Sequence, residues 1–309
     1  MSKKKKKKKI TLPQIIINII FILVGLFCIM PLILVLSVSF SSEHAIITNG
    51  YSFFPQEFTF NAYKYILTGS KTLIKAYMVT IFVTAIGTVC HVFITAMFSY
   101  TLSRQELKYR KVISFLVFFT LLFSGGLVPT YILISRYLHL QNHIGVFILP
   151  YLTNAIHVLI MRNFFRAIPN SIIESARIDG SGEFRTFLKI VLPISLPSLA
   201  TIGLFIAVFL WNDWFTPLLY IENPNLYNLQ FLLRSIMTNI SYLIGNIEKF
   251  RGQEEIFTNL PNDTAMMATC IMAIGPIIIL YPFLQKYFIK GLTLGSVKSQ
   301  NDFILEISR

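Results

Sequence analysis

Charged side chains are scarce in this sequence, and that scarcity decides the class of protein. Asp, Glu, Lys and Arg make up 13% of the 309 residues, whereas a soluble domain contains about 25%. Hydrophobic residues make up 54%, and the mean hydropathy is +0.65. An ordinary water-soluble fold cannot bury that much apolar surface. We therefore predict an integral membrane protein.

Cysteines are few, and the residue patterns of enzymes are missing. Cys28, Cys90 and Cys270 lie far apart inside apolar runs, without the spacing of metal ligands, so we expect no disulfide and no metal site. The sequence contains no Ser-His-Asp or paired-carboxylate pattern and no G-x-x-x-x-G-K-[ST] loop. We therefore predict no enzyme activity and no cofactor on this chain.

The net charge of +13 has an explanation other than nucleic acid. The unbroken run Lys3–Lys9 stands directly before the first apolar stretch, where basic residues face anionic lipid on the cytoplasmic side. That stretch, 15–40, is longer than the roughly 7–15 apolar residues of a signal peptide. We therefore expect it to remain as the first membrane span.

Six apolar segments reach the roughly 20 residues that a helix needs to cross a bilayer. They are 15–40, 76–102, 112–135, 144–162, 198–220 and 264–288. With the N-terminus placed in the cytoplasm, most of the 27 basic residues fall on the inner side. The positive-inside rule then predicts six transmembrane helices in an all-α protein of the bacterial plasma membrane, with both termini cytoplasmic.

These spans divide the chain into three parts. A basic cytoplasmic segment (1–14) precedes the membrane domain (15–290), and a cytoplasmic tail (291–309) follows it. Long external loops are expected at 41–75 and 221–263.

The segment 169–193 is the longest charged, glycine-punctuated interval between two apolar runs, and it is predicted to be cytoplasmic. Ser171 and Glu174 form an S-x-x-E capping box, which begins a short helix. Asp179-Gly180 ends that helix, because glycine tolerates the left-handed conformation of a helix end. Ser181 is predicted to cap a second helix.

The second helix carries an apolar stripe, with Phe184, Phe187, Leu188 and Val191 at i, i+3, i+4 and i+7. Pro193 is expected to end it. Two short helices with a sharp turn at the membrane surface suit a docking surface or a connection lying on lipid, and the pattern alone favours neither. A DNA-binding helix-turn-helix is disfavoured by the apolar spans on both sides.

The stretch ESARIDGSGEFRTFLKIVLP (174–193) resembles the EAA loop of ABC importer permeases, whose pattern is E-A-A-x-x-D-G followed by F, I and L-P. The matching residues are Glu174, Ser175, Ala176, Asp179, Gly180, Phe187, Ile190, Leu192 and Pro193. The sequence departs from the pattern at Ser175 and Ser181, where alanine is usual. Both residues are small, so close packing is expected to survive.

Other stretches extend the resemblance over about residues 10–300. FLWNDWFTPLLY (209–220) resembles a segment of sugar permeases, and QKYFIKGLTLGSVK (285–298) resembles the tail of maltose-type (MalG-like) permeases. LFSGGLVPTYILI and MRNFFRAIPNSIIESARIDGSGEFR are most similar to the LplC/YtcP-like branch of oligosaccharide permeases.

The resemblance implies a type I ABC importer permease (MetI-like) fold, in which 169–193 forms coupling helices seated on a separate ATPase. Ser171 and Phe184 are expected to join the matching residues in that coupling. The implied partners are a second homologous permease, two ATPases that bind ATP and Mg, an extracellular solute-binding lipoprotein and an oligosaccharide. Two alternatives remain open: the same machinery importing a peptide or another small solute, and a membrane sensor or scaffold that does not transport.

Polar and aromatic side chains inside the spans mark a candidate sugar path, because polar groups in a membrane are costly. The candidates are Thr88, His91, Asn154, His157, Trp211, Asn212, Asp213 and Trp214. Plainer explanations are interhelical hydrogen bonds for the threonines, packing for the histidines and an interfacial belt for the tryptophans. Asn212 and Asp213 are the strongest candidates, since an acid near the membrane normally needs a partner.

Overall fold

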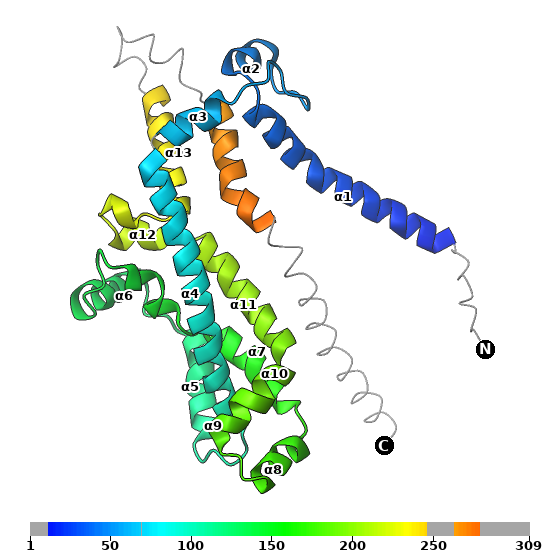
Figure 1. Ribbon diagram of the computed structural model, residues 1–309, viewed down its shortest axis with the longest axis vertical. Helices are drawn as coiled ribbons and strands as arrows, with labels where there is room; N and C mark the ends of the chain where they lie inside the picture. Colours follow the sequence, from blue (N-terminus) through cyan, green and yellow to red (C-terminus); the bar gives the residue numbers. More distant parts are fainter. Residues whose placement is uncertain (1–11, 69, 246–262, 279–309) are drawn as a thin grey trace. The chain divides into compact units, whose positions relative to one another are not determined.

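The computed structural model describes residues 12–68, 70–245 and 263–278, and all of their regular structure is helical (Figure 1). The contacts divide the chain into two units. The first unit takes its described residues from Met1–Ser70 and Asn239–Ile274, and the second takes them from Lys71–Thr238 and Gly275–Arg309. The all-α prediction holds for these described residues.

The first unit begins with a helix that is apolar on every side. Helix α1 (Leu12–Ser39) exposes most of its large hydrophobic side chains, which is typical of a span that faces lipid. Helices α2 (Glu43–Asn49) and α3 (Asn61–Thr68) follow it. The Glu43 carboxylate accepts hydrogen bonds from the backbone N–H groups of Asp263 and Thr264, each at 3.1 Å. It therefore caps the helix that begins at Asp263.

The second unit contains the remaining helices, apart from Ser70 of α4, the end of α13 (239–245) and most of the helix Asp263–Ile278, which belong to the first unit. They are α4 (Ser70–Ser103), α5 (Arg110–Leu122), α6 (Leu127–Ile132), η1 (Leu133–Tyr137), η2 (Ile144–Phe147), η3 (Leu149–Tyr151), α7 (Ala155–Arg166), α8 (Asn170–Ile178), α9 (Glu183–Thr186), η4 (Phe187–Val191), α10 (Leu192–Ile194), α11 (Leu196–Trp211), α12 (Phe215–Tyr220), η5 (Pro224–Leu226) and α13 (Leu229–Gly245). Helix α7 packs against both α5 and α11.

Two helices in the described residues are long and apolar enough to cross a membrane without a break, Leu12–Ser39 and Thr72–Ser103. Three further candidates are bent pairs: Arg110–Leu122 with Leu127–Tyr137 (113°), Ile144–Tyr151 with Ala155–Arg166 (48°), and Glu183–Ile194 with Leu196–Trp211 (82°). By length and composition alone, the described residues therefore provide up to five spans.

The predicted span 112–135 is not one unbroken helix. Helix α5 ends at Leu122, and Gly126 has a φ of +84°, which a residue within a regular helix cannot adopt. Two glycines in succession thus allow the chain to turn sharply.

Two more of the predicted spans are interrupted, and a third is described only in part. The segment 144–162 starts as two short 3₁₀ turns before α7, and 198–220 is interrupted between α11 and α12. The last predicted span, 264–288, is described only as Asp263–Ile278, and its remainder lies outside the described residues.

Helices α4 and α11 lie side by side (Figure 1). Two glycines, Gly87 and Gly203, face the other helix at this contact. A Cβ at Gly87 would lie 2.6 Å from Leu210 Cδ1, and one at Gly203 would lie 3.5 Å from Val92 Cγ2. Small residues at such contacts let membrane helices pack by van der Waals attraction. The spacing between these two helices therefore depends on Gly87.

We expect Gly87→Val to destabilise the second unit by about 1–3 kcal/mol, because the branched side chain overlaps Leu210. Thermal unfolding in detergent should show a midpoint lower by about 3–10 °C. Gly25→Val is the matched control, since a Cβ at Gly25 of α1 meets nothing within 4 Å. Equal midpoints for the two variants would contradict the packing assigned to Gly87.

Candidate functional site

The segment 169–193 contains the predicted helix and turn. Gly180 follows α8 with a φ of +77°. The Ser181 N–H donates to Ala176 O at 2.9 Å, and the Gly180 N–H donates to Arg177 O at 3.0 Å. This pair of bonds is the Schellman arrangement of a helix C-terminus. The predicted role of Gly180 in the turn is therefore seen in the backbone.

Both predicted helix caps are wrong. Helix α8 begins at Asn170 after Pro169, with no side-chain cap hydrogen bond, so Ser171 lies inside the helix and forms no capping box with Glu174. Helix α9 follows Gly182, also without a side-chain cap. The Ser181 hydroxyl instead accepts a hydrogen bond from the Thr186 hydroxyl at 3.1 Å.

The predicted apolar stripe is also divided. Phe187 and Val191 are buried, whereas Phe184 is 59% exposed and Leu188 is 38% exposed. The reason is that Phe187–Val191 forms a π-helix, whose i→i+5 bonding breaks the 3.6-residue period on which the stripe was predicted. The prediction that Pro193 ends the helix is wrong as well, because α10 continues to Ile194.

The other matching residues lie on both faces of this segment. Ala176 is buried, and Ile190 and Leu192 are partly buried. Glu174, Ser175, Asp179 and Pro193 are exposed.

An ion-pair network ties the turn to the loop between α4 and α5. The Arg177 guanidinium donates to Glu183 Oε1 at 2.6 and 2.8 Å and to Glu106 Oε1 at 3.0 Å. Arg104 also contacts Glu106, at 3.3 Å. The Tyr100 hydroxyl donates to Glu183 Oε2 at 3.0 Å. Both carboxylates therefore join α8 and α9 to the end of α4.

The environment of Glu183 favours its charged form. Partial burial on its own would raise the pKa of the Glu183 carboxyl, but the hydrogen bonds from Arg177 and Tyr100 and the Arg177 charge outweigh it, so the pKa lies below its ordinary value. A depressed carboxyl pKa stabilises the fold above the ordinary pKa, and that contribution disappears as pH falls through the folded-state pKa.

We therefore expect Glu183→Gln to lower the unfolding midpoint by about 1–3 °C at pH 7, because the ion pair is largely solvent-exposed. The difference from the unaltered chain should shrink as pH falls below the ordinary carboxyl pKa. A series of thermal unfolding curves from pH 7 to pH 3.5 measures it. A difference that stays constant over this range would contradict the ion-pair role.

Asp213 occupies the break between α11 and α12. Its Oδ1 atom accepts the backbone N–H groups of Phe215 at 3.1 Å and Thr216 at 3.0 Å. Its carbonyl accepts a hydrogen bond from the Asn228 side-chain amide. The residue is 8% exposed, and Oδ2 has no partner among the described residues. Asp213 therefore caps α12 from inside the protein.

Hydrogen bonds from the hydroxyl and from the carbonyl of Tyr151 connect this break with two predicted histidines. The Thr216 and Tyr151 hydroxyls lie 2.8 Å apart. The Tyr151 carbonyl lies 2.6 Å from His91 Nδ1, and His91 Nε2 lies 2.8 Å from His157 Nδ1. The structure thus brings together Asp213, His91 and His157, which the sequence analysis chose separately.

With both imidazoles neutral, the hydrogen-bond partners determine the tautomer of each histidine. A carbonyl can only accept, so His91 Nδ1 carries the proton that points to Tyr151 O. His91 Nε2 is then an acceptor, and His157 Nδ1 must donate to it. His157 Nε2 is left with a lone pair, and it makes no hydrogen bond within the described part of the chain.

The other candidates near Asp213 are Trp211, Asn212 and Trp214. Trp211 is buried at the end of α11. Asn212 is exposed, and its amide donates to Val208 O at 2.8 Å. The Trp214 ring lies beneath the Arg234 guanidinium, 3.7 Å from the ring centroid, which is a cation–π contact.

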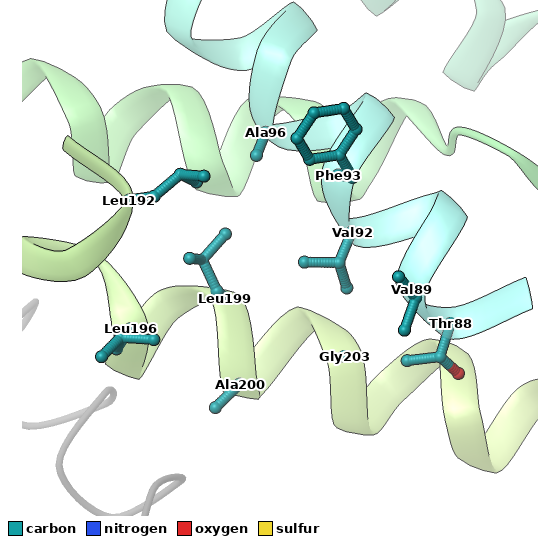
Figure 2. A pocket seen from close by; sticks show the side chains of 10 residues that line it. All are labelled: Thr88, Val89, Val92, Phe93, Ala96, Leu192, Leu196, Leu199, Ala200 and Gly203. Atoms are coloured by element: carbon teal, nitrogen blue, oxygen red, sulfur yellow. The ribbon is translucent and has the colours of Figure 1, made fainter. Parts of the chain in front are cut away.

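Asn154 and Thr88 lie elsewhere in the second unit. Asn154 is the N-cap of α7, and its Oδ1 accepts the Ile156 N–H at 2.9 Å. Thr88 lies on the wall of an apolar groove of about 540 Å³ between α4 and α10–α11 (Figure 2). Its hydroxyl has no partner among the described residues.

The sequence pattern did not predict the roles of Tyr151, Thr216 and the Arg177–Glu106 pair. Tyr151 takes part through its hydroxyl, which bonds to Thr216, and through its backbone carbonyl, which bonds to His91 and which no residue type can reveal. Glu106 and Arg177 are 71 residues apart, so only the fold places them together. In the sequence, only the charge of Arg177 in an otherwise apolar protein indicated that it needs a partner of opposite charge.

Long and bent apolar helices, polar side chains hydrogen-bonded between them and an exposed helical turn are features expected of a solute permease. Comparison with known proteins agrees. Residues 78–294 match the family described as "Binding-protein-dependent transport system inner membrane component". The chain belongs to this family, and its resemblance to the oligosaccharide permeases is confirmed.

Three known proteins illustrate the relationship. The chain is 39% identical to the polygalacturonan/rhamnogalacturonan transport system permease protein YtcP of Bacillus subtilis, over 89% of this chain and 94% of the relative. It is 36% identical to Protein LplC of Bacillus subtilis, over 91% and 93%. A crystal structure of a bacterial ABC transporter that imports the acidic polysaccharide alginate matches with a TM-score of 0.77 and 29% identity, covering 92% of this chain and 99% of the matched chain.

Proposed function

We propose that this chain is one permease half of an ATP-driven importer of oligosaccharides. The observation that carries the proposal is the 39% identity to YtcP over 94% of that relative, whose name assigns it to polygalacturonan/rhamnogalacturonan transport. A related permease is named for arabinooligosaccharides. Uptake of radiolabelled trigalacturonate, arabinotriose and maltotriose by cells with and without the chain tests the function. Equal uptake of all three in both strains would overturn it.

The cytoplasmic helices are the proposed contact with the ATPase. Ile178 is 86% exposed and Phe184 is 59% exposed, and both flank the Gly180 turn. Large apolar side chains exposed together on the aqueous side of a membrane protein favour a protein partner. ATP and Mg are assigned to that partner, and closure of two ATPases would move α8 and α9.

The network around Arg177 supports this mechanism. It binds α8 and α9 to Glu106 and to Tyr100 at the end of α4. A displacement of the turn is therefore passed to a membrane-spanning helix through direct ion pairs and hydrogen bonds, and not through a loose connection.

Six spans with both ends in the cytoplasm complete the proposal, with a second homologous permease enclosing the path. The loops 41–75 and 221–263 are expected to face an extracellular solute-binding lipoprotein. Alkaline phosphatase fused after Asn49 should be active, and the same enzyme fused after Arg104 should be inactive. The opposite result would reverse the proposed orientation.

A pull-down from mild detergent, with the bound proteins identified by mass, tests the partners. Recovery of a second permease and an ATPase with a nucleotide-binding loop is expected. Recovery of this chain alone, well folded and in several detergents, would favour a membrane scaffold and would overturn the importer.

A further inference from the structure

His157, on α7, presents a hydrogen-bond acceptor, Nε2, that no side chain or backbone group of the described residues uses. Its Nδ1–H is committed to His91 Nε2, and the side chain is only half-buried. Placing a polar atom against hydrocarbon without a hydrogen-bond partner raises the free energy of the folded protein. The face of α7 that carries His157 is therefore better suited to water, cargo or a polar partner than to lipid.

Asn154 supplies a donor on the same helix. Its Oδ1 is used to cap α7, whereas its side-chain NH₂ group makes no hydrogen bond within the described residues and is exposed. Residues three apart in a helix are neighbours, with about 5–6 Å between their Cβ atoms. A donor and an acceptor thus stand one helical turn apart.

Aromatic rings from two other elements accompany these polar groups. The Phe205 ring lies along His157, with centroids 6.1 Å apart and planes at 23°. The Phe209 ring meets Tyr151 at 5.1 Å and 63° and remains 48% exposed. Tyr151 is in turn bonded to His91. An aromatic surface therefore lies on the next turn of α11, beside the ring that covers His157.

We propose that Asn154, His157 and Phe209 form a subsite for one sugar ring of the cargo, an inference that rests on the proposed function. Neighbouring hydroxyls of a sugar offer one O–H donor and one oxygen acceptor, which match His157 Nε2 and the Asn154 amide. The C–H face of the ring packs on Phe209. Small-molecule sites combine apolar and aromatic walls with a few placed polar groups in this way.

Two conservative variants remove only the polar atoms that are proposed to meet the sugar. His157→Asn retains an amide N–H near the position of Nδ1, so the bond to His91 survives while the Nε2 acceptor is lost. Asn154→Asp retains the capping oxygen Oδ1 and replaces the NH₂ donor with a carboxylate oxygen, which can only accept. His139→Asn is the matched control, because His139 is exposed with a φ of +50° that asparagine tolerates.

The complete importer, reconstituted in proteoliposomes with its partner subunits and binding protein, is assayed with labelled trigalacturonate, arabinotriose and maltotriose. Each of the first two variants should import about five- to tenfold fewer trisaccharides per ATP hydrolysed. ATP hydrolysis stimulated by the loaded binding protein should stay unchanged. The double variant should lose less than the product of the single losses, because one ring uses both groups.

The other outcomes overturn the subsite in different ways. Unchanged uptake in both variants, while the unaltered importer transports one of the three sugars, removes the subsite and leaves the importer function intact. A parallel fall in uptake and ATP hydrolysis assigns His157 and Asn154 to structure alone. If the unaltered complex transports none of the three sugars and its ATP hydrolysis is not stimulated, the proposed function fails and the subsite fails with it.

Discussion

Replacing Gly180 with proline is expected to reduce oligosaccharide uptake below about a tenth of its normal rate. Gly180 has a φ of +77°, and the proline ring fixes φ near −65°. The substitution also removes the N–H that donates to Arg177 O. The turn between α8 and α9 then cannot form, so the proposed contact with the ATPase is lost. Uptake and membrane insertion are measured in the same cells.

Gly182→Pro is the matched control for this change. Gly182 has a φ of −68°, which proline adopts without strain. Its carbonyl accepts a hydrogen bond from the Thr186 N–H at 2.9 Å, and its own N–H donates to no described residue. Uptake should therefore persist in the control. Normal uptake in Gly180→Pro, with the protein inserted, would show that this turn does not couple the chain to transport.

The second large effect is expected at the exposed apolar residues beside the turn. Ile178→Asp combined with Phe184→Asp should weaken ATPase binding about a hundredfold or more, because each side chain buried on docking contributes about 1.5–3 kcal/mol. Both side chains are exposed on this chain, so folding should be little affected. Binding is measured by co-purification of the ATPase at increasing salt and detergent.

Tyr137→Asp serves as the control for this pair. Tyr137 is 74% exposed and lies in η1, on the predicted external side of the membrane. Its replacement should leave ATPase recovery unchanged. Undiminished recovery with Ile178→Asp and Phe184→Asp would mean that the ATPase binds another surface.

Local pattern was sufficient where one residue type permits one backbone conformation. Asp179-Gly180 was predicted to end a helix, and Gly180 does so, because only a residue without Cβ adopts a positive φ freely. The caps at Ser171 and Ser181 were wrong because helices can also start one or two residues away, here after Pro169 and Gly182. Sequence seldom separates such neighbours.

The 3.6-residue periodicity of apolar residues predicted the buried face less reliably where an α-helix gives way to a π-helix. The stripe from Phe184 to Val191 assumed 3.6 residues per turn, and the π-helix at Phe187–Val191 altered which side chains face the core. The span 112–135 was predicted from hydropathy, and hydropathy does not reveal a turn of the backbone. The glycines before α6 were visible in the sequence, but the 113° bend was not.

The sequence by itself determined that this protein lies in a membrane, how its basic residues are distributed and where its glycine turn falls, because these follow from composition and from local backbone limits. Only the tertiary structure decided that His91 meets His157, that Asp213 caps α12 and that Arg177 joins Glu106. These contacts link residues up to 71 positions apart, and apolar side chains of many kinds could bring the same helices together. Burial then requires each polar group to find a partner, and the packing of the helices determines which partner is within reach.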